Sequence, residues 1–269
     1  MSNELRAELD AWIDANWDPD IAVREWWQRL SSAGLTNPGL TQPFGKGWGR
    51  TETRILAAAL RERGAIGSPA GLGMLLAAPT ILAHGSDTQI DRYVPRILDG
   101  TDAWCQLFSE PGAGSDLAGL QTKAIRDGDE WVITGQKVWT SEGQHADLGM
   151  LIARTDPDAP KHRGISWFAF PMRQEGVEVR PLREMTGRSL FNEVFIDEAR
   201  VSHQDLIGEL NDGWRVANTT LTVERAGIGG GHGLAYAAAH PGSIAGHLER
   251  PAGSFIGKRL ALAAGGVGP

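Results

Sequence analysis

Apolar residues recur every three or four positions through the first hundred residues of the chain. The run TETRILAAALRERGA has this spacing, with Thr51 as the expected N-cap and Gly64 as the expected end of the helix. The run SDTQIDRYVPRIL repeats the pattern, and Ser86 followed by Gln89 three residues later indicates a capping box. Two further amphipathic runs, ELRAELDAWIDANW and IAVREWWQRLSSAG, lie upstream. The pattern predicts a helical N-terminal domain over residues 1–100.

From Trp104 onward the apolar pattern changes to the shorter period of β-strands. The stretch AIRDGDEWVIT places Asp127, Gly128 and Asp129 between two alternating runs, which indicates a hairpin. Short apolar runs separated by turn residues follow it, namely GQKVWTS, DLGMLIAR, GISWFAF, VEVRP and EVFID. We therefore expect an antiparallel β-domain over residues 101–210.

Helical spacing returns near Asn211 in NDGWRVANTTLTVERAG, and the run GIGGGHG then interrupts it. No convincing long helix follows that interruption, so residues 211–269 are expected to be an incomplete C-terminal helical segment. Helices, then one β-region, then the start of further helices predict an α+β fold, because a doubly wound sheet would alternate strands with helices.

Composition excludes several classes of function. The net charge of −7 gives no basic footprint for nucleic acid or an anionic membrane surface. The N-terminus MSNELRAELD has neither signal-peptide nor transit-peptide character, so we expect a cytoplasmic protein. The apolar run at residues 72–83 is interrupted by Pro79 and is shorter than the roughly 20 residues of a membrane span. It is expected to be a core helix.

Nucleotide and metal motifs are largely absent from the sequence. The single cysteine, Cys105, lies in an apolar run and is expected to be a buried hydrophobe, so no disulfide, cysteine metal site or other metal centre is predicted. The dinucleotide pattern G-x-G-x-x-G fails after Gly112 and Gly114, because Leu117 occupies the third glycine position. A phosphate-binding loop of the G-x-x-x-x-G-K-[ST] type does not occur.

The stretch SEPGAGSDLAG raises the main functional question. Residues 111–115 follow an apolar strand and would expose backbone N–H groups free of side chains, which suits an anion, and Ser115 adds a hydroxyl donor. The alternative is an ordinary tight turn, which is the more common structure for such residues. These residues alone leave both interpretations open.

The surrounding sequence resembles the acyl-CoA dehydrogenase family. The signature-like stretch at residues 104–141 reads WCQLFSEPGAGSDLAGLQTKAIRDGDEWVITGQKVWTS, and the likeness continues through MTGRSLFNEVFIDEARV, LIGELNDGWRVA and LTVERAG. The resemblance implies a helical N-terminal domain, a central β-domain and a C-terminal helical bundle. It also implies FAD bound between the β-domain and the bundle, with the acyl thioester against the flavin.

The resemblance assigns cofactor contacts to the strand and turn of this stretch. Gln106, Phe108 and Ser109 match residues that touch the flavin ring and ribityl chain. Ser115 matches a residue that approaches the FAD pyrophosphate or the CoA part of the substrate, so it is a candidate for both cofactor and substrate binding.

Two further cofactor contacts match the motif KVWTS. Trp139 would pack its ring on the flavin, and the Ser141 hydroxyl would form a hydrogen bond near flavin N5. Stacking and a donor to a ring that accepts hydride are plausible roles for these side chains. The alternative is that Trp139, one of ten tryptophans, fills the core.

Dehydrogenation of a thioester needs a base for the α-proton, and a carboxylate serves if burial raises its pKa. The family places this Glu either late in the bundle or on the first helix after the β-domain, as in its isovaleryl-CoA and long-chain branches. Glu224 of LTVERAG matches the second position. Trp214, Ala217 and Leu221 share its helix face, which favours an inward carboxylate. The alternative is a surface Glu.

The sequence also departs from the family. The bundle Arg followed by Phe-Gly, which contacts the FAD of a neighbouring subunit, has no match, since neither Arg250 nor Arg259 lies in that pattern. Ser202 replaces a Pro that is common after the β-domain. The late catalytic position has no counterpart, so we expect a chain truncated in its C-terminal helical domain.

The resemblance implies an FAD-dependent acyl-CoA dehydrogenase of lipid metabolism. Its partners would be an acyl-CoA substrate and an electron-transfer acceptor protein, in a homo- or hetero-oligomer. One alternative is a non-catalytic or degenerate partner subunit of such a complex. The other is a flavin monooxygenase on the same scaffold, in which Glu224 would be dispensable.

Overall fold

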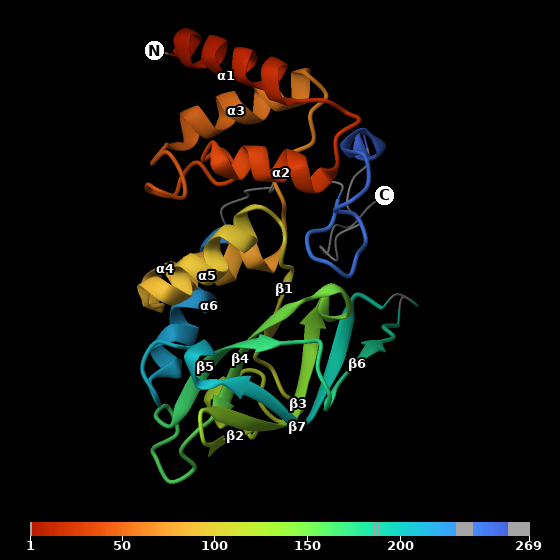
Figure 1. Cartoon of the computed structure of the whole chain (residues 1–269). Helices are drawn as coiled ribbons and strands as arrows, with labels where there is room; N and C mark the ends of the chain where they lie inside the picture. The colour runs from red at the N-terminus through yellow and green to blue at the C-terminus, as the bar shows by residue number, and fades with distance from the viewer. Residues whose placement is uncertain (1, 186, 188, 230–238, 258–269) are drawn as a thin grey trace.

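Helices form the end of the molecule that carries the N-terminus, and a second layer of helices lies between them and a β-domain (Figure 1). The computed structural model describes residues 2–185, 187, 189–229 and 239–257. The helices are α1 (Ser2–Asn16), α2 (Val23–Ser32), α3 (Arg50–Glu62), α4 (Ala78–His84), α5 (Asp87–Leu98) and α6 (Gly213–Gly229). The predicted α+β class is confirmed.

The starts of two helices test the capping predictions. The Ser86 box is confirmed, because the Ser86 hydroxyl accepts the Gln89 N–H and the Gln89 side chain accepts the Ser86 N–H. Thr51 as N-cap of α3 was wrong. The helix begins at Arg50 with Gly49 as its N-cap, because the Glu52 carboxylate accepts the Gly49 N–H at 3.1 Å.

The apolar run at residues 72–83 is a core helix, as expected. It begins as a π-helical turn at Gly73–Ala77 and continues into α4. Leu76, Ala77 and Ile81 are fully buried there. In the described part of the chain, no helix combines the length and apolar character needed to cross a membrane.

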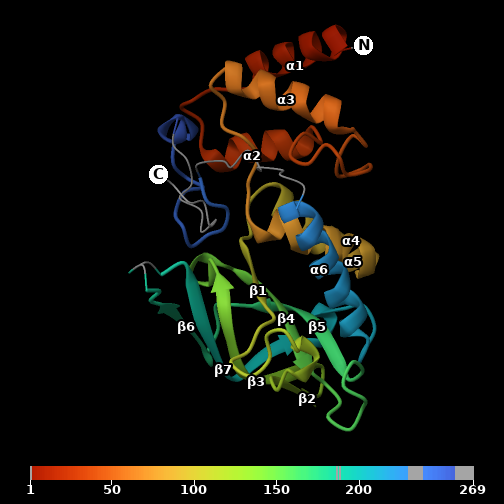
Figure 2. The ribbon, with the colours of Figure 1, turned by 180° about the vertical axis from the view of Figure 1, so that it is seen from behind.

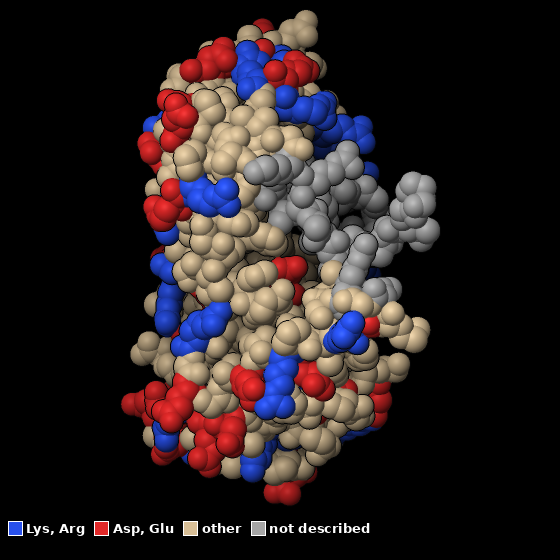
Figure 3. Space-filling model, turned by 90° about the vertical axis from the view of Figure 1, so that its right-hand side faces the viewer, with Lys and Arg blue, Asp and Glu red and all other residues tan. Residues whose placement is uncertain are grey.

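On the face seen in Figure 3, basic and acidic side chains are intermingled.

One twisted sheet forms the β-domain. Its strands are β1 (Trp104–Leu107), β2 (Lys123–Asp127), β3 (Glu130–Ser141), β4 (Leu148–Arg154), β5 (Ile165–Pro171), β6 (Val177–Leu182), β7 (Phe191–Ser202) and β8 (Leu206–Ile207). The order is β6-β7-β3-β2-β4-β5-β8, and β1 pairs with β4. Most pairs are antiparallel, as predicted, whereas β1 runs parallel to β4 and β2 meets β4 in a single parallel pair.

The predicted hairpin joins β2 and β3. Asp127 pairs with Glu130, so Gly128 and Asp129 form a two-residue turn. Gly128 has a φ of 60°, which suits a turn whose first central residue lies in the left-handed region.

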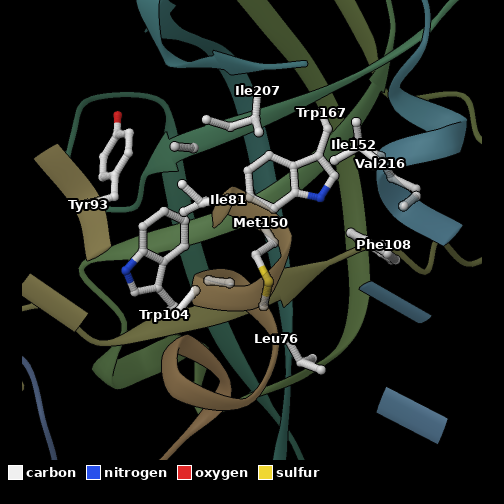
Figure 4. Packing of buried hydrophobic residues seen from close by; sticks show 14 of the residues in the cluster. Leu76, Ile81, Tyr93, Trp104, Phe108, Met150, Ile152, Trp167, Ile207 and Val216 are labelled. Atoms are coloured by element: carbon white, nitrogen blue, oxygen red, sulfur yellow. The ribbon is translucent and has the colours of Figure 1, made fainter. Parts of the chain in front are cut away.

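Strands β1, β4 and β5 share a core with the second helical layer. Trp104, Met150 and Trp167 contribute one large side chain from each strand, and Figure 4 shows them converging. Val216 of α6 is fully buried in the same cluster. Helix α6 therefore packs against both β5 and α4, and Figure 2 shows it beside them.

Residues 239–257, called the C-terminal strap below, link the helical region to the β-domain. The Val23 N–H donates to the Arg250 carbonyl at 3.0 Å, which ties the strap to α2. At its other end the Gly242 N–H donates to the Gly100 carbonyl at 2.8 Å, and Ser243 donates to Asp147 beside β4. The strap thus touches both the helical region and the β-domain.

Helix α5 is held to the β-domain by a buried carboxylate. Asp205, only 4% exposed, accepts the Tyr93 hydroxyl at 2.6 Å and the Arg92 guanidinium at 2.7 Å. Burial and the neighbouring Asp205 raise the pKa of Tyr93, so its hydroxyl keeps the proton that it donates.

The Tyr93 hydroxyl gives a stability prediction. Replacing Tyr93 by Phe leaves buried Asp205 with one donor fewer, and the free energy of unfolding should fall by about 1–3 kcal/mol. Urea denaturation followed by circular dichroism measures it. Thr51→Ala is the control and should change stability by less than about 0.5 kcal/mol, because Thr51 is exposed and caps no helix. If Tyr93→Phe lost no more stability than Thr51→Ala, the proposed stabilising link between Tyr93 and Asp205 would be contradicted.

Candidate active site

The end of β1 runs alongside the end of β3. The Val138 N–H donates to the Ser109 carbonyl at 2.9 Å, so Ser109 lies next to the segment that carries Trp139 and Ser141. Phe108 is 4% exposed and belongs to the shared core. Four of the predicted cofactor residues therefore lie on two adjacent backbone segments.

Trp139 does not fill the core. Its side chain is 61% exposed, and its φ of 61° lies in a region that non-glycine residues seldom occupy. The register between β3 and β7 shifts between Lys137 and Thr140, which marks a bulge at this residue. The indole contacts Phe191 edge-on, with ring centroids 5.9 Å apart. The core-filling alternative is thus wrong, and the bulge leaves a large aromatic face open.

Glu224 and Gln106 meet although 118 positions separate them. The Gln106 side-chain amide, on β1, donates to the Glu224 carboxylate at 3.3 Å, and both residues are half-buried. On the same helix face Ala217 is fully buried, while Trp214 and Leu221 pack against the core. Helix α6 thus carries the carboxylate to Gln106 on β1, the strand that leads directly into Phe108 and Ser109.

The glycine-rich loop after β1 is open toward solvent. Glu110 and Ala113 exchange two backbone hydrogen bonds of 3.0 Å, which closes a tight turn, and Ser115 is exposed. A side-chain carbon added at Gly112 or Gly114 would meet nothing within 4 Å. Packing within the described chain therefore does not require glycine at these positions, and the turn leaves room for a close approach from outside.

Sequence reasoning missed the ion pair beneath this loop. Lys137 of β3 is fully buried, and its ammonium donates to the Glu110 carboxylate at 2.9 Å and to the Phe108 carbonyl at 3.1 Å. Glu110 also accepts the N–H groups of Gln121 (2.6 Å) and Thr122 (3.0 Å). One carboxylate thus joins both ends of the loop to β3.

Burial and the charge of the partner shift the pKa of each residue of this pair in opposite directions. Burial lowers the pKa of Lys137 to about 8, although Glu110 opposes that shift. Burial alone would raise the pKa of Glu110, but the Lys137 charge and the three hydrogen bonds hold it below the ordinary value of 4.5. The carboxylate is therefore ionised, and the ammonium is its counter-ion at neutral pH.

Cys105 behaves as predicted. It is fully buried, and burial raises the pKa of its thiol to about 12, so no reactive thiolate forms near neutral pH.

Two hollows on the described part of the surface lie away from the predicted site residues. A hollow of about 420 Å³ is lined by residues around β6, among them Gln144, Met172 and Val179. None of the seven predicted site residues lines it. Within the described residues, Trp139 and Ser115 are exposed, so the candidate site between β1, β3 and α6 is open to solvent beside these two side chains.

Two protein-family models match the chain. "Acyl-CoA dehydrogenase, N-terminal domain" matches residues 1–101, and "Acyl-CoA dehydrogenase, middle domain" matches residues 105–198. Among curated relatives, acyl-CoA dehydrogenase FadE34 of Mycobacterium tuberculosis is 45% identical over 89% of this chain, which spans 36% of that protein.

Solved structures agree with these matches. The Tcur3481-Tcur3483 steroid ACAD is 34% identical with a TM-score of 0.65, covering 84% of this chain and 62% of that chain. The ChsE4-ChsE5 complex from Mycobacterium tuberculosis is 34% identical with a TM-score of 0.63, covering 82% and 59%. This chain therefore spans less than two thirds of each of these three relatives.

The buried ion pair gives a second stability prediction. Lys137→Met leaves Glu110 buried without its counter-ion, and the free energy of unfolding should fall by about 3–5 kcal/mol. The double variant Glu110→Gln with Lys137→Met removes both charges and should recover most of this loss. Guanidinium denaturation measures both, and equal losses in the single and double variants would contradict the ion-pair account.

The lowered pKa of Glu110 predicts a pH dependence. As the pH falls below 4.5, Glu110 takes up its proton in the unfolded chain before it does so in the folded protein. The stability that this carboxylate contributes is therefore present above pH 4.5 and is lost as the pH falls through the pKa of the folded state. We expect wild-type stability to decline more steeply below 4.5 than that of the double variant. Denaturation curves at several acidic pH values measure this, and parallel declines would contradict it.

Proposed function

We propose a function from one premise: this chain belongs to the acyl-CoA dehydrogenase family. The family consists of FAD-dependent oxidoreductases. We propose that the chain takes part in α,β-dehydrogenation of an acyl-CoA thioester, with Glu224 as the base. This chain spans less than two thirds of the three relatives described above. The activity of the whole protein is therefore also part of the proposal.

The observation that carries the proposal is the contact between Gln106 and Glu224. It places the family-matched carboxylate beside the strand whose sequence resembles the flavin-contacting strand. A base must reach the α-carbon while the β-carbon faces the acceptor, so the carboxylate and the flavin-contacting residues have to share one site. The meeting of β1 and α6 supports that arrangement.

Each group of this chain has a defined task in the proposed reaction. Glu224 removes the α-proton of the thioester and becomes a carboxylic acid. The Gln106 amide orients that carboxylate by donating to one of its oxygens. FAD, when bound, would accept the hydride that leaves the β-carbon with its two electrons, while the electron pair of the broken α-C–H bond forms the new double bond.

The residues around Trp139 fit a planar cofactor. An indole that is 61% exposed, on a backbone with positive φ, offers a flat surface for stacking. We propose that Gln106 on β1, together with Phe108 and Ser109 directly after that strand, holds the ring and ribityl chain. Two hydroxyls complete the proposed contacts: Ser141 near the flavin ring and Ser115 at the pyrophosphate or the CoA moiety.

We further propose that a second polypeptide covers this open site. One similar structure is a complex of two differently named chains, ChsE4 and ChsE5, and the candidate site here is an uncovered surface. A homo- or hetero-oligomer would supply the missing wall, and an electron-transfer protein would reoxidise the flavin. A steroid-side-chain CoA thioester is the first substrate to test, because one similar structure is a steroid ACAD.

The base assignment gives a test. Glu224→Gln should leave bound flavin unchanged and lower turnover by about 10²–10⁴-fold, because the amide cannot accept the α-proton. Visible absorbance measures the flavin, and bleaching by the acyl-CoA measures the reaction. Glu175→Gln is the matched control, since Glu175 is exposed in the connection between β5 and β6 and should keep wild-type turnover.

The outcomes separate the three candidate functions. Equal turnover in Glu224→Gln and wild type would contradict the base assignment. Equal turnover together with oxygen-dependent oxidation of a substrate would favour the flavin monooxygenase. A protein that stays colourless after FAD is added, alone and with its partner chain, would favour a non-catalytic subunit.

A further inference from the structure

A cluster of metal-ligating side chains lies outside the candidate active site. Glu142 and His145 belong to the turn that follows β3, where residues Gly143–His145 form a short 3₁₀ helix. His240 comes from the C-terminal strap. One ligand atom from each of the three residues lies within 4.8 Å of the other two.

The distances suit a tetrahedral cation. The Glu142 carboxylate oxygen Oε2 lies 3.0 Å from His145 Nδ1 and 3.9 Å from His240 Nδ1. Metal–ligand bonds of about 2.0–2.1 Å at tetrahedral angles would place neighbouring ligand atoms about 3.3 Å apart. The first of these spacings is already near that value, and the second would have to shorten by about 0.6 Å when a cation binds.

His247, a third histidine, lies beside this set. The His240 backbone N–H donates to His247 Nδ1 at 2.9 Å, and the two rings lie 5.4 Å apart. The His247 ring in turn packs on Phe255, with centroids 4.9 Å apart.

We propose that Glu142, His145 and His240 form a binding site for Zn²⁺. Two imidazole nitrogens and one carboxylate match zinc and its transition-metal neighbours, whereas Mg²⁺ and Ca²⁺ prefer sites made of oxygen ligands. Water would occupy the fourth position. The sequence analysis predicted no metal centre, so this inference departs from it.

The consequence of such a site is structural. Two ligands belong to the turn that follows β3 and one belongs to the strap, so a bound cation would cross-link His145 to a residue 95 positions further along the chain. The strap also binds α2 through the Val23 and Arg250 backbones. The cation would therefore fix the strap between the helical region and the β-domain.

The test is calorimetric titration of the whole chain, untagged and stripped of metal, with ZnCl₂ at neutral pH. We expect one Zn²⁺ per chain. Both His145→Asn and His240→Asn should weaken binding by at least about tenfold, a loss that even outer-shell partners of a metal can cause. His162→Asn is the matched control, because His162 packs on Trp214 away from the cluster and should keep the wild-type affinity.

Titration with CoCl₂ adds a readout of geometry. Strong visible absorption bands typical of tetrahedral Co²⁺ should develop in the wild type and be lost in His240→Asn, while circular dichroism shows that the variant is folded. Absence of Zn²⁺ binding, or unchanged affinity in both cluster variants, would overturn the proposal. The cluster would then be an ordinary hydrogen-bonded pair of Glu142 and His145 with a histidine beside it.

Discussion

The arrangement of the candidate site depends on one buried ion pair, Lys137 with Glu110. A fully buried ammonium is costly unless a counter-ion and hydrogen-bond acceptors surround it, and here the Glu110 carboxylate and the Phe108 carbonyl provide them. The same carboxylate accepts two N–H groups from the far end of the glycine-rich loop. The end of β1, the loop and β3 therefore cannot move independently.

The position of Trp139 follows from this constraint. Lys137 must point into the protein to reach Glu110, and strict alternation would send Trp139 inward as well, because residues two apart on a strand share a face. The register shift between Lys137 and Thr140 breaks that alternation. The bulge releases the indole to the surface, next to the segment that Ser109 borders. A polar contact inside the protein thus determines where an aromatic face appears outside it.

Local pattern was sufficient to predict much of the fold. Helical spacing, the Ser86 capping box and the hairpin at Gly128 depend on residues within a few positions of one another, and all three were correct. The start of α3 was misplaced because Gly49 has no side chain to signal an N-cap, and its partner is the Glu52 carboxylate. The parallel pairing of β1 with β4 could not be read from either strand alone.

The site was predicted only where a resemblance supplied residues. Glu224 and Gln106 were named separately, and nothing local indicates that they touch. Glu110 and Lys137 were missed because charged residues in a sequence are usually solvated, and their burial is visible only once both strands are placed. His145 and His240 are likewise brought together by the strap, a segment whose composition predicts no regular structure.

The part of the chain that follows the β-domain has two distinct structural effects. Helix α6 buries Val216 against the shared core and carries Glu224 to β1, so it closes one side of the candidate site. The strap lies against α2 and reaches Asp147 beside β4, so it joins the helical region to the β-domain. Because the strap meets Glu142 directly after Ser141, whatever fixes the strap also restrains the end of the strand that presents Trp139. The end of β3 that presents Trp139 is therefore linked to the strap through Glu142 and His240.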